Sequence, residues 1–133
     1  MSPAAATGEP EQAYRLGRVS CAEGQAVGCN YAFAPVADID FEYHNPITNV
    51  RTYGSDPETV KKYALAYMRA AKECGTAVSV KHFPGDGVDE VDQHIQTSVN
   101  PEGIRITEVL QHGQERRADD HVGNPVGCRR AGD

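Results

Sequence analysis

One local pattern, a helix ended by glycine followed by a strand ended by proline, occurs twice in this chain. In the first copy, small and apolar residues recur at helical spacing over Pro10–Val27, and Gly28 follows as a helix stop. The residues Asn30–Ala34 have strand composition, and Pro35 ends the run. The face of this helix predicted to be buried comprises Ala13, Leu16, Gly17, Ser20, Gly24 and Val27.

The second copy repeats the pattern with stronger signals. A helix is predicted over Ser55–Cys74, where Ser55 and Glu58 have the spacing of a capping box and Gly75 follows as the stop. The strand Ala77–Lys81 comes next. The apolar positions of this helix recur at steps of three and four, at Val60, Ala64, Tyr67, Met68 and Ala71. Alternation of helix and strand predicts an α/β fold with the two strands parallel and side by side.

Length and charge exclude several classes of protein. A chain of 133 residues suits one small domain, and its formal net charge is −6 with no run of Lys or Arg. Duplex nucleic acid and anionic membranes both require a concentrated positive face, so neither is expected as a partner. No apolar stretch is long enough to cross a bilayer.

The N-terminus and the cysteines predict a cytoplasmic protein. Met1–Ala4 lacks the basic and apolar regions of a signal peptide. The cysteines Cys21, Cys29, Cys74 and Cys128 show no CxxC spacing, so neither a zinc knuckle nor a disulfide framework is indicated.

The chain changes character after about residue 100. All aromatic residues lie at or before Phe83, and Pro101–Asp133 is rich in charged and small residues. We therefore expect residues 1–100 to form the organised unit and residues 101–133 to form a weakly ordered tail. Such a tail is either a flexible extension or a sequence outside its proper reading frame.

The densest ionisable cluster, KHFPGDGVDEVDQH at residues 81–94, begins where the second strand ends. The first strand is likewise followed by Asp38, Asp40 and Glu42. Parallel α/β proteins place their chemistry at the carboxyl ends of the strands. The sequence therefore predicts a functional site at this edge of the sheet.

Several segments resemble glycoside hydrolase family 3. Tyr31–Ile39 is similar to its strand-end motif, and Asn45-Pro46 followed by Arg51–Pro57 is similar to its Asn-Pro, Arg-Ser-Phe-Gly and Asp-Pro segment. Lys81–Gly85 reads Lys-His-Phe-Pro-Gly, a signature of the family. Asp92–His94 resembles the Asp-Ser-His element of its β-N-acetylhexosaminidase branch. The resemblance covers about residues 5 to 100, with the motifs in the family's order.

The resemblance implies a (β/α)8 TIM barrel that cleaves terminal β-linked sugars with retention, as a β-N-acetylhexosaminidase or a β-glucosidase. His94 would be the catalytic acid/base and Asp92 its orienting partner. Arg51, Lys81 and His82 would bind sugar hydroxyls. The chemistry agrees, because a histidine with an ordinary pKa of about 6.5 can protonate a leaving group near neutral pH. No cofactor is implied.

The chain departs from the family in ways that indicate a fragment. Asp86 stands where the family's loop usually repeats a histidine, and no residue matches the aspartate nucleophile, since Ser55-Asp56 lies at a helix start. A TIM barrel takes about 250 residues, so two βα repeats make about a quarter of one. The unpaired edges of two strands would favour self-association.

Two alternatives use the same residues differently. A non-catalytic carbohydrate-binding remnant would use Arg51, Lys81 and His82 without turnover. A metal site would use the hard and borderline ligands of the cluster, which are His82, Asp86, Asp89, Asp92 and His94. Because the acids fall at steps of three, unlike those of an EF-hand loop, a solvated acidic loop is preferred and no metal is expected.

Overall fold

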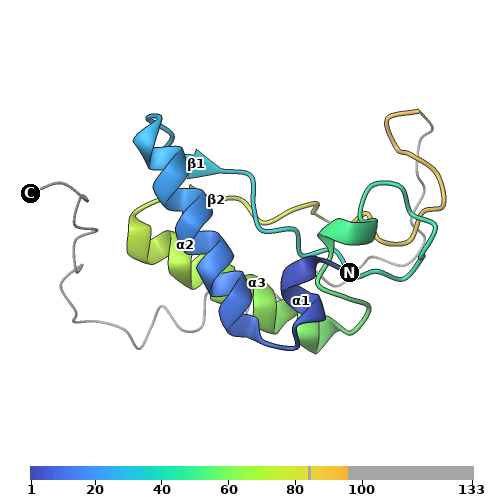
Figure 1. Ribbon diagram of the computed structural model, residues 1–133. Coiled ribbons are helices and arrows are strands. Elements are labelled where there is room, and N and C mark those ends of the chain that lie inside the picture. The colour runs from blue at the N-terminus through green and yellow to red at the C-terminus, as the bar shows by residue number, and fades with distance from the viewer. Residues whose placement is uncertain (84, 96–133) are drawn as a thin grey trace, which may run out of the picture.

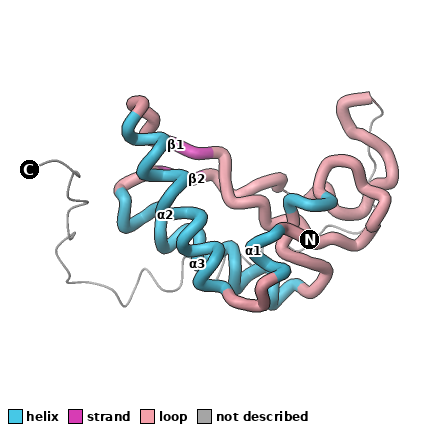
Figure 2. Tube along the Cα trace, viewed as in Figure 1, coloured by secondary structure: helices cyan, strands magenta, loops and turns pink. Residues whose placement is uncertain are grey.

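A computed structural model describes residues 1–83 and 85–95 of the chain. Figure 1 shows the helices α2 (Pro10–Ala26) and α3 (Pro57–Cys74) packed along each other beside two short strands, and Figure 2 shows that the rest of the described chain is loop apart from short helical segments. The elements are α1 (Pro3–Ala6), α2 (Pro10–Ala26), β1 (Tyr31–Ala32), a 3₁₀ turn (Asn49–Arg51), α3 (Pro57–Cys74) and β2 (Ala77–Val78). The predicted tail, residues 101–133, lies outside the described residues.

The two strands are parallel and adjacent, as predicted. Tyr31 pairs with Ala77 and Ala32 with Val78, and an isolated parallel bridge joins Val36 to Lys81. The strands are shorter than predicted because the ladder is interrupted at Pro35, which has no N–H to donate. The chains nevertheless continue side by side, since Lys81 N–H donates to the Pro35 carbonyl at 3.1 Å. The α/β class is thus confirmed. Within the described residues the sheet has two strands, so the complete barrel remains a prediction.

Helix α2 confirms the predicted helix to within one residue. Its buried residues are Ala13, Gly17 and Cys21, spaced by four, and it packs mainly on α3. Gly17 is required there, because a Cβ atom would lie 2.9 Å from the carbonyl oxygen of Tyr67. The predicted buried face is correct at Ala13 and Gly17 but was too wide. Small residues bring the helices close along one narrow ridge, which leaves exposed Leu16, Ser20 and Val27.

Helix α3 is the central helix of the described structure. The predicted face is correct at Val60, Ala64, Tyr67 and Ala71, which are buried, whereas Met68 is partly exposed. Further buried residues are Tyr63, Ala70 and Cys74. Gly75 ends the helix with a φ of 75°, a left-handed conformation that glycine adopts without strain.

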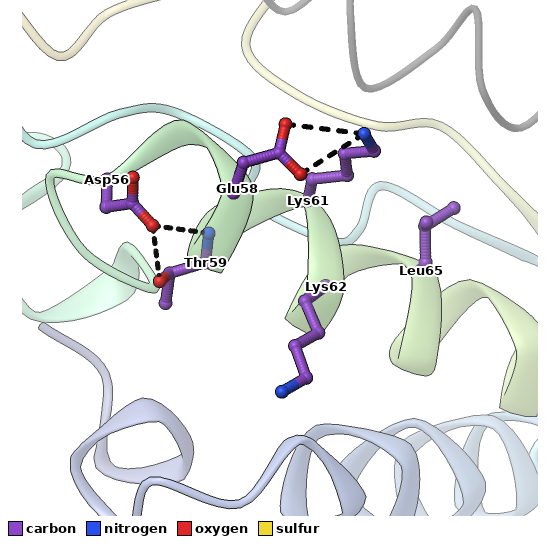
Figure 3. Close-up of a pocket in the computed structure, with 6 residues that line it drawn as sticks. All are labelled: Asp56, Glu58, Thr59, Lys61, Lys62 and Leu65. Atoms are coloured by element: carbon purple, nitrogen blue, oxygen red, sulfur yellow. Dashed lines mark hydrogen bonds and ion pairs between the residues drawn. The ribbon is translucent and has the colours of Figure 1, made fainter.

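The predicted capping box at the start of α3 was wrong. Asp56, not Ser55, is the N-cap: its carboxylate accepts hydrogen bonds from Thr59 N–H at 2.8 Å and Thr59 Oγ1 at 2.6 Å (Figure 3). Glu58 instead pairs with Lys61 at 3.3 Å on the exposed side of the helix. Serine and aspartate can both cap a helix, and Asp56 is the cap because the helix begins at the next residue, Pro57.

We expect Asp56→Ala to lower the free energy of unfolding by about 1 kcal/mol, because it leaves the Thr59 N–H of the first turn unpaired. Ser55→Ala is the matched control and should change stability by less than about 0.5 kcal/mol. Urea denaturation followed by circular dichroism measures both variants. Equal losses would restore Ser55 as a cap.

The aromatic part of the core predicts alkaline instability. Tyr53 is buried and stacks on Tyr63, with ring centroids 5.4 Å apart. Burial raises the pKa of the Tyr53 hydroxyl from 10.0 to about 12. A raised pKa contributes stability that is complete below pH 10 and is lost as the pH rises to about 12, in total about 3 kcal/mol. Tyr53→Phe should flatten the decline in unfolding free energy over this interval; an unchanged decline would contradict the assignment.

No helix in the described part of the chain is both long and apolar enough to cross a membrane.

Candidate active site

The segments that follow the two strands are docked together at the carboxyl end of the sheet. The carbonyl of Gly87 accepts from Phe41 N–H at 3.0 Å and from Glu42 N–H at 2.9 Å. A Cβ atom at Gly87 would lie 1.7 Å from the Ile39 carbonyl oxygen, so only glycine allows this approach. The predicted convergence of the two strand ends is therefore observed.

Asp38 is the buried centre of this region. Its carboxylate is fully inaccessible and contacts His82 Nδ1 at 2.6 Å, His82 N–H at 3.2 Å and Asp86 N–H at 2.9 Å. A carboxylate only accepts hydrogen bonds, so His82 carries its proton on Nδ1 and its Nε2 remains for another partner. Asp38 thus fixes both the orientation and the tautomer of His82.

Asn45 organises the long connection that follows the first strand. Its Oδ1 accepts from the N–H groups of Ile47 and Thr48, both at 2.8 Å, while its Nδ2 donates to the carbonyl of Asp86. Arg51 Nη1 then donates to the Ile47 carbonyl at 2.9 Å. The buried Asn45 therefore ties the segment that carries Arg51 to the loop after the second strand.

Asp92 and His94 form the pair that the family resemblance implies. Asp92 Oδ1 lies 2.6 Å from His94 Nδ1 and accepts from His94 N–H at 2.8 Å. The His94 backbone N–H, and secondly its ring, hold the pKa of the Asp92 carboxyl below its usual value. With Nδ1 held by Asp92, Nε2 is the nitrogen of His94 free for proton transfer. The imidazole is largely exposed, with 81% of its side chain accessible.

A cavity of about 450 Å³ lies between these segments. Its lining residues are Ile47, Arg51, His82, Asp86, Gln93 and His94. Three of the five predicted site residues, Arg51, His82 and His94, therefore share one cavity. Asp92 does not line the cavity but contacts the His94 ring. Lys81 does not line it; its backbone instead bridges to Val36.

Three residues that build the site, Asp38, Asn45 and Gln93, were given no individual role by the sequence, although Asp38 was named among the acids that follow the first strand. Asp38 and Asn45 lie inside motifs quoted above, but short polar residues after a strand give no sign of which partners they contact. Gln93 lies between Asp92 and His94, and its side chain also lines the cavity. The sequence feature that could have drawn attention to Gln93 is that it replaces the serine of the family's Asp-Ser-His element.

A second depression, of about 360 Å³, covers the first turns of α3 (Figure 3). It is lined by Asp56, Glu58, Thr59, Lys61, Lys62 and Leu65. The helix cap at Asp56 and the Glu58–Lys61 ion pair engage most of its polar groups, and none of the predicted site residues lines it. We assign it no chemistry.

The ligand set considered for a metal does not converge among the described residues. In that part of the chain, a different set of possible ligands lies close together: one ligand atom each from Glu42, His44 and Glu90, all within 4.8 Å of one another. His44 Nδ1 lies 2.9 Å from Glu42 Oε1, and the backbone N–H of His44 is the main cause that lowers the pKa of Glu42. Because Glu42 and His44 satisfy each other and Glu90 is exposed, this cluster carries no metal assignment.

Comparison with known proteins decides the family. The model of the family described as "Glycosyl hydrolase family 3 N terminal domain" matches residues 1–114. The chain belongs to glycoside hydrolase family 3. A β-N-acetylglucosaminidase/β-glucosidase from Cellulomonas fimi is 51% identical over 96 residues, covering 72% of this chain and 17% of that protein. A β-hexosaminidase from Pseudomonas aeruginosa is 36% identical over 101 residues, covering 76% of this chain and 29% of its own length.

Solved structures share the fold of this chain. A β-glucoside phosphorylase superposes with a TM-score of 0.72 at 46% identity, covering 86% of this chain and 20% of that one. A β-N-acetylglucosaminidase from Paenibacillus sp. str. FPU-7 gives a TM-score of 0.64 at 38% identity, covering 68% and 17%. The chain thus spans less than a third of the length of each of these relatives.

Proposed function

We propose that this chain supplies the sugar-binding and acid/base half of a retaining β-glycosidase site. The observation that supports it most is the shared cavity, which brings Arg51, His82 and His94 together at the carboxyl end of the sheet. The names of the family 3 relatives point to terminal β-linked N-acetylglucosamine or glucose as the sugar.

The proposed chemistry starts with a proton on His94. Its Nε2–H gives that proton to the glycosidic oxygen as the bond to the leaving group breaks and the anomeric carbon bonds to the nucleophilic carboxylate. Asp92, bound to Nδ1, keeps the ring in the required tautomer and stabilises the imidazolium. In the second step His94 takes a proton from the water that releases the sugar.

Arg51 and His82 hold the sugar in this proposal. The guanidinium of Arg51 is a planar donor suited to adjacent hydroxyls. His82 presents Nε2, since Asp38 occupies Nδ1. Lys81 is kept as a sugar ligand on its motif position alone. The nucleophilic carboxylate, about 5 Å from the acid group in retaining enzymes, is not assigned to any residue of this chain.

Binding of sugar to the 133-residue chain tests this proposal. N-acetylglucosamine should cause saturable NMR shifts at Arg51, His82 and His94, while hydrolysis of an aryl N-acetylglucosaminide stays near background. Arg51→Ala should abolish the shifts; Arg69→Ala, an exposed arginine on α3, is the matched control. Absence of saturable shifts in the unmodified chain would reject the sugar-binding role. Binding that persists without turnover after the rest of a barrel is supplied would favour the non-catalytic remnant.

A phosphorylase is the second candidate, because the solved protein that is 46% identical to this chain is named a β-glucoside phosphorylase. Phosphate would then replace water in the second step, and the cationic Arg51 is suited to hold it. Formation of a sugar 1-phosphate in the presence of inorganic phosphate would distinguish this reaction from hydrolysis.

A further inference from the structure

Asp86 is held on both sides by buried side chains. Its N–H donates to Asp38 Oδ1 at 2.9 Å, and its carbonyl accepts from Asn45 Nδ2. Asp38 and Asn45 are each at most 1% exposed. The Asp86 backbone is therefore a fixed point at the carboxyl end of the sheet.

The side chain of Gln93 returns to this fixed point from seven residues further along the chain. Gln93 Nε2 donates to Asp86 Oδ1 at 2.9 Å and to Asp89 Oδ2 at 3.0 Å. An amide NH₂ has two hydrogens, one for each carboxylate, so a single neutral group bridges two like charges. The residues on either side of Gln93 are the proposed acid/base His94 and its partner Asp92.

We propose that Gln93 is a positioning residue, whose amide clips the loop of residues 86–94 closed and thereby places the Asp92–His94 pair at the cavity. The catalytic consequence rests on the proposed function, whereas the clip itself does not. The start of the loop is also anchored, since the Gly87 carbonyl accepts from Phe41 N–H and Glu42 N–H, whereas near its end Ile95 N–H donates locally to the Asp92 carbonyl at 2.9 Å. His94 is highly exposed, so packing does little to hold its ring in place.

The chemistry of position 93 is restrictive. The side chain must reach across to Asp86, which a serine is too short to do, and it must donate without adding negative charge. Asp86 and Gln93 are also the positions at which the two loop motifs depart from the family pattern, and the structure shows them hydrogen-bonded to each other. Each departure supplies the partner that the other requires.

Gln93→Glu tests the clip in the intact 133-residue chain. The substitution keeps the shape of the side chain, removes both donors and adds a third carboxylate beside two. Backbone order parameters of residues 88–95 should fall from about 0.85 to below about 0.6, while α2 and α3 are unchanged. Added N-acetylglucosamine should still shift Arg51 and His82 but no longer His94. Gln12→Glu, the same change in the first turn of α2, should leave the loop unaffected.

Reversal of both hydrogen bonds provides a rescue. In the triple variant Gln93→Glu, Asp86→Asn, Asp89→Asn, the two asparagine amides become donors and the glutamate becomes the acceptor. This variant should restore the order of residues 88–95. Should Gln93→Glu unfold the chain, Gln93→Ser, which removes the reach without adding charge, is measured in the same way. Loop order equal to that of the unmodified chain in the folded variant overturns the proposal. If the unmodified chain shows no sugar-induced shift, the proposed function fails while the order parameters still decide the clip.

Discussion

His94→Ala should lower kcat by about 100- to 10,000-fold in a chimera that supplies the rest of the enzyme. In this chimera, residues 1–95 replace the corresponding segment of the Cellulomonas fimi relative, which is 51% identical to this chain over 96 residues. The loss is expected because, in the proposed function, His94 protonates the leaving oxygen. It should be largest for alkyl glycosides and smallest for aryl glycosides of acidic phenols, whose leaving groups need little protonation.

His44→Ala is the matched control for this experiment. His44 is also an exposed histidine that is paired with a carboxylate two residues earlier, but it does not line the cavity. Its substitution should leave kcat within a factor of about two. Turnover unchanged by His94→Ala, in a chimera that is active, would remove His94 from the acid/base role.

Asp38→Ala should produce the largest loss of stability, about 3 kcal/mol or more. The carboxylate is inaccessible and contacts three N–H groups of His82 and Asp86, so its removal leaves three part-buried donors without this partner. The His82 ring also loses the contact that fixes its tautomer, and sugar-induced shifts at His82 should disappear. Urea denaturation and an NMR titration with N-acetylglucosamine measure the two effects.

Glu23→Ala, at an exposed position of α2, is the control and should change stability by less than about 0.5 kcal/mol. Asp38→Asn keeps one acceptor oxygen and should lie between the two. A variant Asp38→Ala as stable as Glu23→Ala would show that Asp38 does not organise the site.

The helices and the pairing of the strands could be predicted because their signals are local. Spacing of small and apolar residues placed α2 and α3 to within two residues, and Gly75 ended its helix as expected. Alternation of helix and strand was enough to predict parallel pairing. The rule that parallel sheets carry chemistry at their carboxyl ends then placed Arg51, His82 and His94 near one another.

Contacts between distant segments decided the rest. The Asp38–His82 contact joins residues 44 apart in the sequence and the Asn45–Asp86 contact joins residues 41 apart, and no local pattern encodes either distance. The chain path makes Asp56 rather than Ser55 the N-cap. Pro35, next to the Val36–Lys81 bridge, shortens the ladder because it has no N–H to donate. Lys81 carries the family signature, yet it does not line the cavity that its neighbour His82 lines. Sequence determines which groups are available; tertiary packing determines which of them meet, since the partners of a buried polar group are set by the whole chain path rather than by its neighbours.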